Sequence, residues 1–223
     1  MGRFARQAGA RRVIAPVWID GPGGMLPDPG DAPLVWRLRL DDPAVVRAAE
    51  GAALREDDLR DLAGRPQAAM RGLRRRLMRV MIARMAQCHP DAIAFARGPM
   101  GEPLILAPEG WHVSVAGRWP HGLIGIARAG LGVDIEPADT LPPPVDALTP
   151  GEQAEAPDEH ERIRRWTAKE AHAKLYGVAS RIDPADIHTW ADGALLRARS
   201  VSGMSICHTA DLGGTFCAVA RAA

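Results

Sequence analysis

The stretch WTAKEAHAK, residues 166–174, lies in a run of helix-forming residues that extends from 158 to 176 and stops before Gly177. Glycine is a frequent C-terminal cap, so this pattern predicts a helix that ends there. Glu170 and Lys174 are four residues apart, which places them on one helix face, about one turn apart. A carboxylate and an ammonium in this arrangement can bind a metal ion and an anionic group side by side. An ordinary solvated ion pair has the same spacing.

A second acidic stretch lies upstream, GVDIE at residues 132–136. On a strand, Asp134 and Glu136 point to one face, while Val133 and Ile135 point to the other, into a core. Two neighbouring carboxylates repel each other unless a cation lies between them, and hard oxygen ligands suit Mg²⁺ or Mn²⁺. A structural arrangement, with one carboxylate ion-paired and the other solvated, fits the same pattern.

Composition restricts the class of protein. The chain has 223 residues, of which 47% are hydrophobic, enough to bury a sizeable core as one domain or two small lobes. A net charge of +1 argues against a general nucleic-acid binder. The three cysteines show no CxxC spacing, which suits a reducing compartment. No apolar run has membrane-spanning length and no signal-peptide core is present, so we expect a cytoplasmic protein without a membrane partner.

The N-terminal half of the sequence reads as short strands around one long helix. Residues 34–40 alternate apolar and basic side chains, the pattern of a half-buried strand. The helix expected at about 66–87 has a stripe of Met and Leu on one face and Arg71, Arg75 and Arg79 on another. The arginines form either a solvated face or a phosphate-binding row, since guanidinium groups bind phosphate oxygens in bidentate fashion. DNA binding through this helix is a third reading, weakened by the neutral overall charge.

The C-terminal half contains more strand patterns. Residues 123–127 and 131–135 are apolar runs joined by a three-residue link that ends in Gly130, which predicts a hairpin. Further short antiparallel strands are expected at 187–190, 194–201, 204–208 and 215–219. We expect an α+β fold, a pseudo-twofold duplication of two small α/β lobes, 12–117 and 118–223, after a flexible segment 1–11.

The two acidic stretches, in this order and at this separation, resemble the paired signature of the 4′-phosphopantetheinyl transferases. The nearest type is the two-lobed, surfactin-synthetase-activating one. Residues 112–119 resemble the family's serine-containing segment, Gly101-Glu102-Pro103 its Gly-Lys-Pro turn, and the helix of Arg71 its N-terminal-lobe helix. The likeness therefore covers most of the chain.

The resemblance implies that a monomer binds coenzyme A between two lobes. Its phosphopantetheine arm is transferred to a serine hydroxyl of an apo acyl or peptidyl carrier protein, and 3′,5′-ADP is released. Carried over, Asp134, Glu136 and Glu170 hold Mg²⁺ (or Mn²⁺) against the pyrophosphate. Lys174 neutralises the transferring phosphate, and Glu170 accepts the serine proton. The carrier proteins would be those of polyketide, nonribosomal peptide or fatty acid synthesis.

The resemblance also implies a set of coenzyme-binding residues. In it Arg71 meets the 3′-phosphate and Lys174 the transferring phosphate, and the rest are Arg75, His112, Ser114 and Lys169. For His112, a purely structural role is as compatible with the sequence as contact with the nucleotide. Ser114 lacks the GxSxG motif that surrounds a nucleophilic serine. Lys169 ranks lower, because it points away from the face that carries Glu170.

Three positions depart from the family pattern at the expected 3′-phosphate site. Val115 stands where the family has a phosphate-contacting His, Ala116 replaces a small polar residue, and Glu102 replaces the Lys of the turn. Three consequences are open. Coenzyme A is bound weakly, or one of Arg74, Arg75 and Arg118 replaces the missing positive charge, or the site accepts dephospho-coenzyme A as donor. A second function follows from the same departures: a catalytically weak homologue that binds coenzyme A or a carrier protein without transfer.

Overall fold

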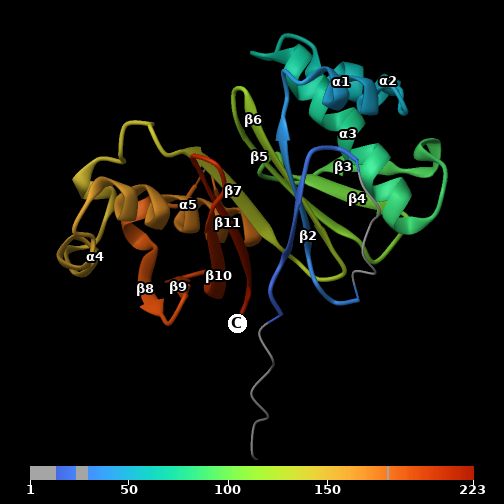
Figure 1. Cartoon of the computed structure of the whole chain (residues 1–223). Helices are drawn as coiled ribbons and strands as arrows, with labels where there is room; N and C mark the ends of the chain where they lie inside the picture. The colour runs from blue at the N-terminus through green and yellow to red at the C-terminus, as the bar shows by residue number, and fades with distance from the viewer. Residues whose placement is uncertain (1–13, 24–29, 180) are drawn as a thin grey trace, which may run out of the picture.

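Two β-sheets, each with a long helix packed against it, lie side by side in this computed structural model, which describes residues 14–23, 30–179 and 181–223 (Figure 1). The first sheet has the strand order β1-β2-β6-β5, and the second has the order β7-β11-β10-β9-β8. Within the described residues, no helix is both long and apolar enough to cross a membrane.

The first sheet pairs β1 with β2 in parallel, and its other pairs are antiparallel. A two-stranded sheet and three helices accompany it. The elements up to β6 are β1 (Val17–Asp20), β2 (Leu34–Arg39), α1 (Pro43–Ala49), α2 (Glu56–Leu62), α3 (Ala68–Ala86), β3 (Ala94–Arg97), β4 (Pro103–Ala107), β5 (His112–Arg118) and β6 (His121–Ala127), with a 3₁₀ turn at Pro90–Ala92.

The second sheet is antiparallel throughout. The pattern-based strands at 187–190, 194–201, 204–208 and 215–219 all exist, within three residues of their expected ends. The elements are β7 (Gly132–Pro137), α4 (Pro150–Glu155), α5 (Glu159–Leu175), β8 (His188–Asp192), β9 (Leu195–Ser200), β10 (Gly203–Asp211) and β11 (Thr215–Ala222), with 3₁₀ turns at Val145–Ala147 and Pro184–Asp186.

Helix α5 begins and ends where its sequence predicts. The side chain of Asp158 accepts a hydrogen bond from the backbone N of Glu161 at 2.8 Å, which satisfies one of the free N–H groups of the first turn. After the last helical residue, Gly177 adopts φ of 64°, the left-handed conformation that glycine adopts at low cost. Both ends of the helix that carries WTAKEAHAK are therefore fixed locally.

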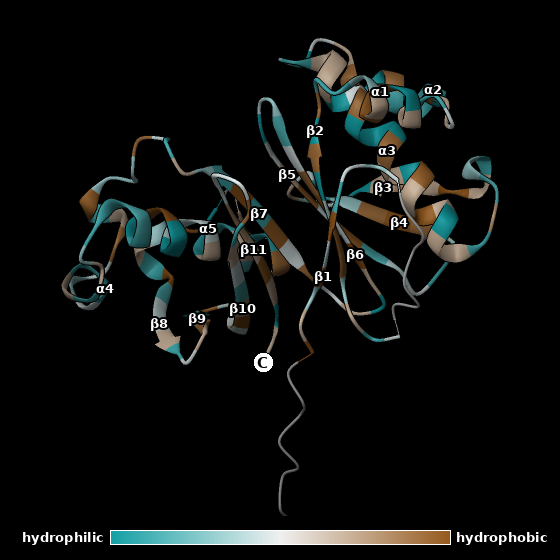
Figure 2. Ribbon diagram, in the orientation of Figure 1, coloured by the Kyte–Doolittle hydropathy of each residue, from teal (hydrophilic) through white to brown (hydrophobic). Residues whose placement is uncertain are grey.

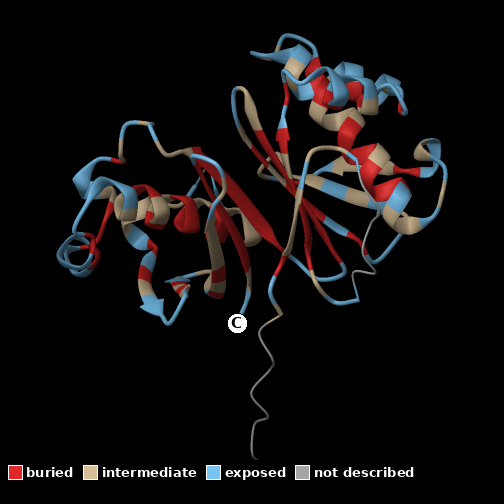
Figure 3. Ribbon diagram, in the orientation of Figure 1, coloured by how far each residue is buried: buried red, intermediate tan, exposed pale blue. Residues whose placement is uncertain are grey.

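Strand β2 is buried on both faces in its first half, whereas the expected half-buried pattern holds at Arg37 and Arg39. Leu34, Trp36 and Leu38 pack into the cluster formed with α3. Val35 points the other way, into a cluster that includes Val133 of β7. The second sheet covers Val35, on the face that the alternating pattern assigns to solvent. Figures 2 and 3 show β7 as a largely hydrophobic, buried strand.

The predicted hairpin between 123–127 and 131–135 is wrong. Strand β6 pairs with β2 along one edge and with β5 along the other, so neither edge is left for β7. Strand β7 pairs with β11 in the second sheet. The link 128–131 therefore carries the chain from one sheet to the other.

The expected α+β class is confirmed. The pseudo-twofold duplication and the lobes 12–117 and 118–223 stay predictions. Because β6 belongs to the first sheet, strand pairing favours a boundary within 128–131. The segment 1–11 lies outside the described residues.

Candidate active site

The two acidic stretches of the sequence meet in the structure. Strand β7 packs against α5, and Lys174 Nζ lies 2.6 Å from Asp134 Oδ1. The Asp134 side chain is 7% exposed and that of Lys174 is 24% exposed, so the ammonium group still reaches solvent beside a buried carboxylate. Residues forty positions apart thus form one ion pair at the boundary of the two sheets.

Glu136 is held by two donors from different elements. Arg118, at the end of β5, donates from Nε to Glu136 Oε2 at 2.8 Å and from its terminal nitrogen to Oε1 at 3.2 Å. Trp166 Nε1 donates to the same Oε1 at 3.3 Å. A bidentate guanidinium fixes both the position and the orientation of a carboxylate. The first residue of WTAKEAHAK therefore helps to hold the second carboxylate of GVDIE.

Burial and neighbouring negative charge raise the pKa of two carboxyl groups of the site, those of Asp134 and Glu170. Burial raises the pKa of Asp134 to about 7, against the pull of Lys174, and Glu136 and Glu170 add to the rise. Burial also raises the pKa of Glu170, with a further contribution from Glu136. Negative charge is therefore concentrated here at a cost, and a cation would relieve it.

The chemistry of the donors at this point suits a divalent ion. Asp134 Oδ2 is buried and has no hydrogen-bond partner among the described residues. Carboxylate oxygens are the ligands that Mg²⁺ and Mn²⁺ prefer. As the side chains lie, no group of three His, Cys, Asp or Glu residues in the described ranges could hold a metal ion. Lys174 occupies one oxygen of Asp134, and Arg118 holds Glu136, so binding an ion requires these pairs to rearrange.

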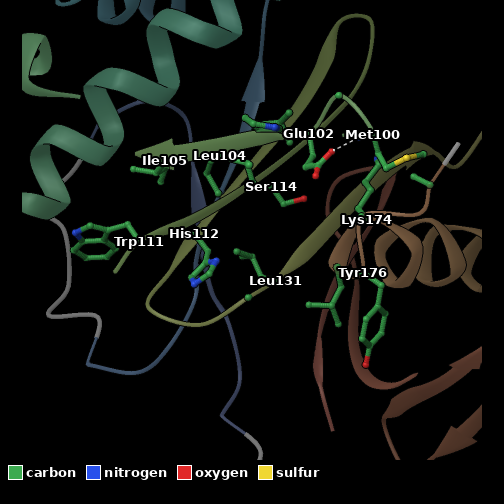
Figure 4. A pocket seen from close by; sticks show the side chains of 18 of the residues that line it. Met100, Glu102, Leu104, Ile105, Trp111, His112, Ser114, Leu131, Lys174 and Tyr176 are labelled. Carbon is green, nitrogen blue, oxygen red and sulfur yellow. Dashed lines mark hydrogen bonds between the residues drawn. The ribbon is translucent and has the colours of Figure 1, made fainter. Parts of the chain in front are cut away.

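A cavity of about 660 Å³ opens beside the ion pair, between β4 and β5 on one side and the C-terminal end of α5 on the other. Figure 4 shows Lys174 and Tyr176 on the α5 side, Trp111 and His112 on the β5 side, and Ser114 and Glu102 between them. A volume of this size is typical of small-molecule sites.

Comparison with known proteins gives a consistent result. The family described as the 4′-phosphopantetheinyl transferase superfamily matches residues 130–208, which contain both acidic stretches. A protein of Synechocystis sp. that carries the provisional name 4′-phosphopantetheinyl transferase is 30% identical over 171 residues. This chain is therefore similar to 4′-phosphopantetheinyl transferases over a region that contains both acidic stretches. The aligned region covers 69% of this chain and 66% of that relative, slightly less than two thirds of its length.

Two of the coenzyme-binding residues expected for this superfamily line the cavity through β5. His112 is exposed at its wall. Ser114 is buried, and its Oγ accepts a hydrogen bond from the backbone N of Val133 at 3.1 Å. Ser114 therefore joins β5 of the first sheet to β7 of the second, a role that fixes the width of the site.

Lys169 is the clear correction to the expected set. Its side chain is fully buried and its Nζ lies 2.7 Å from Glu152 Oε2. The same nitrogen donates to the carbonyl oxygens of Ala147 and Pro184 at 2.8 and 2.9 Å. All of its hydrogen-bonding capacity is used on the side of α5 away from Lys174, so the prediction that Lys169 binds the coenzyme is wrong.

Two arginines of α3 have different environments. Arg71 is exposed, and its Nε donates only to the carbonyl of Pro66. Arg75 lies against two carboxylates, at 3.4 Å from Asp58 and 3.1 Å from Asp61. Arg75 therefore already has two carboxylate partners, and its role as a coenzyme ligand stays a prediction.

The sequence did not predict the ion-pair partners of Lys169 and Glu136. Thr149 and Glu152 form a capping box at the start of α4, but nothing in the sequence shows that Glu152 also meets Lys169. The contact between Arg118 and Glu136 likewise depends on how the two sheets face each other. Such pairings between distant segments have no local sequence signal.

Proposed function

We propose that this protein transfers the 4′-phosphopantetheine moiety of coenzyme A to a serine hydroxyl of an apo carrier protein and releases 3′,5′-ADP. The observation that carries the proposal is the contact between Asp134 and Lys174 beside the cavity, with Glu136 and Glu170 close to it. Phosphoryl-type transfer needs charge neutralisation and positioning more than covalent help, and this group of side chains supplies both.

In this proposal Asp134, Glu136 and Glu170 hold a Mg²⁺ or Mn²⁺ ion. When bound, the ion neutralises charge on the pyrophosphate oxygens of the donor. The support is the buried, unpartnered Oδ2 of Asp134 and the mutual repulsion of the three carboxylates.

Lys174 and Glu170 act directly on the reacting groups. The serine oxygen attacks the phosphorus that bears the pantetheine arm, and the bond from that phosphorus to the bridging oxygen breaks. Lys174 lies at the cavity wall, where its ammonium donates to the phosphate oxygens. Glu170 accepts the serine proton, and its raised pKa brings it closer to the working pH of a general base. The charge on the leaving 3′,5′-ADP stays on its phosphate oxygens.

The apolar side of the cavity suits the pantetheine arm. Leu104, Ile105 and Leu131 line it opposite Lys174. An arm with few charges can lie along these side chains while the pyrophosphate reaches the polar end. The carrier proteins we expect belong to polyketide, nonribosomal peptide or fatty acid synthesis in the cytoplasm, and the transferase acts as a monomer.

A second function has a specific observation in its favour. Val115 and Glu102 remove positive partners from the expected 3′-phosphate site, and Lys174 is already paired with Asp134. A homologue that binds coenzyme A or a carrier protein without transfer would tolerate both features. Turnover separates the two functions.

The test is intact-protein mass spectrometry of several apo carrier proteins incubated with this protein, coenzyme A and Mg²⁺. The proposal predicts a mass gain of one phosphopantetheine, which disappears when a chelator is added and returns with excess Mg²⁺. Measurable coenzyme A binding without any mass gain would support the binding-only homologue. Absence of both would exclude the proposed activity.

A further inference from the structure

Both carboxylate oxygens of Glu136 are occupied by donors. Arg118 Nε lies 2.8 Å from Oε2, and a terminal nitrogen of the same guanidinium lies 3.2 Å from Oε1. Trp166 Nε1 also donates to Oε1, at 3.3 Å. Asp134, by contrast, keeps one oxygen, Oδ2, without a partner among the described residues. Glu136 is therefore the carboxylate whose partners have to change before it can bind an ion.

The two donors to Glu136 differ in charge. A guanidinium that spans both oxygens is positively charged, so a divalent ion on either oxygen would meet a like charge at close range. The indole N–H of Trp166 is neutral and uses one lone pair of Oε1, and a carboxylate oxygen has a second. Arg118 therefore competes with an ion for Glu136, whereas Trp166 does not.

Arg118 is also the donor that can leave. It is the last residue of β5, and its side chain is 60% exposed, whereas that of Glu136 is 6% exposed. Within the described ranges, Glu136 is its only ion-pair partner. Water can solvate the released guanidinium, so the exposed partner loses little. The buried carboxylate loses its charge compensation unless another cation replaces the guanidinium.

Trp166 is held in place independently of Arg118. It belongs to α5, one turn before Glu170, and this helix packs on β7 so closely that a Cβ at Gly132 would overlap its backbone. The indole therefore stays beside Glu136 whichever cation the carboxylate binds.

We infer that Arg118 is an internal counter-ion that the divalent ion displaces from Glu136, and that Trp166 positions the carboxylate for that ion. The inference rests on the proposed function, under which Glu136 is a ligand of Mg²⁺ or Mn²⁺. It predicts effects of opposite sign for two donors to one carboxylate. A merely structural role of both side chains would lower the ion affinity in both variants.

The test measures Mn²⁺ binding to the full chain by electron paramagnetic resonance of the free ion, without donor or carrier protein. We expect Arg118→Gln to bind Mn²⁺ about tenfold more tightly, because a charge-assisted hydrogen bond to Glu136 no longer opposes the ion. Trp166→Phe should bind Mn²⁺ about tenfold more weakly, a usual effect of losing a group that orients a metal ligand.

Arg39→Gln is the matched control. Arg39 is also 60% exposed and lies at the same end of the first sheet, since both Arg39 and Arg118 are opposite His121 of β6. Its ion-pair partner is Asp41, which is not part of the site. The Mn²⁺ affinity of Arg39→Gln should equal that of the wild type.

A double-mutant cycle separates an effect through Glu136 from the general positive charge of Arg118. In a Glu136→Gln background, Arg118→Gln should give no gain in Mn²⁺ affinity. An equal gain in that background, no gain in the wild-type background, or no Mn²⁺ binding by any of these proteins overturns the inference. Wild-type Mn²⁺ affinity in Trp166→Phe overturns the role given to Trp166.

Phosphopantetheine transfer is a separate readout. If the wild type transfers the group and Arg118→Gln gives no gain in Mn²⁺ affinity, the inference fails and the proposed function stands. A gain that depends on Glu136, without transfer to any carrier protein, establishes the counter-ion and contradicts the proposed function.

Discussion

At the scale of single residues, the two lysines of WTAKEAHAK have opposite environments. Lys174 pairs with Asp134 at the mouth of the cavity and keeps access to solvent. Lys169, five positions earlier, is buried and paired with Glu152 on the other side of the helix. Sequence spacing put Lys174 on the face of Glu170 correctly. It could not show that Lys169 has a buried partner, because Glu152 lies in a separate helix.

The buried pair between Lys169 and Glu152 predicts a loss of stability when the lysine is replaced. Lys169→Met leaves Glu152 buried without its ammonium partner, and breaking a buried pair in this way costs about 3–5 kcal/mol. Urea unfolding should therefore show a loss in the free energy of unfolding of about 3 kcal/mol. The coenzyme A affinity of the folded variant should be unchanged. Weaker coenzyme binding at unchanged stability would restore the original assignment of Lys169.

At the scale of elements, the site depends on how closely β7 approaches α5. Gly132 lies against the helix backbone, and a Cβ at this position would overlap the carbonyl oxygen of Ala171 and the backbone N of Leu175. The same helix is tied to the sheet by His172, whose ring nitrogens lie 2.7 Å from Ser205 Oγ and 2.9 Å from Ser200 Oγ. Both contacts hold α5 against the sheet that carries Asp134.

Gly132→Ala should push β7 away from α5. Overpacking costs about 1–3 kcal/mol, and the obstacle here is backbone, which yields less than a side chain. We expect a lower Tm. We also expect the transfer rate to fall by more than the fraction of folded protein does. Gly151→Ala is the control, since a Cβ there meets no atom within 4 Å. Wild-type Tm and turnover in Gly132→Ala would show that this contact does not position the site.

His172 makes stability depend on pH. Burial lowers its pKa from 6.5 to about 4, so the unfolded chain takes up a proton below pH 6.5 that the folded protein refuses until about pH 4. The contribution of neutral His172 to the free energy of unfolding is complete above pH 6.5 and is lost as the pH falls towards 4. This loss is about 2 kcal/mol after allowance for partial solvation. Denaturant unfolding of His172→Gln should show a smaller loss over this range. The exposed His188→Gln should behave as wild type, and equal slopes in all three would contradict the assignment.

At the scale of the whole molecule, the site exists because two sheets share a core. Val35 and Val133, from different sheets, pack in one cluster, and Ser114 bonds across the same boundary. The α+β class, most element positions and the meeting of the two acidic stretches could be predicted from local periodicity and from the family resemblance. The pairing of β6 with β2 and β5 could not, because a short link that contains glycine suits a hairpin and a crossing between sheets equally well.

We propose that the side chains of β7 and α5 catalyse phosphopantetheine transfer. The most direct measurement is the initial rate of mass gain of an apo carrier protein with coenzyme A and Mg²⁺, compared between Glu170→Gln and Glu159→Gln. Glu159 lies on the same helix, 70% exposed and far from the cleft, so its variant controls for loss of one charge on α5. We predict that Glu170→Gln slows transfer by about 10²–10⁴-fold, the usual contribution of a general base, while Glu159→Gln keeps the wild-type rate. Equal rates in the two variants would contradict the account.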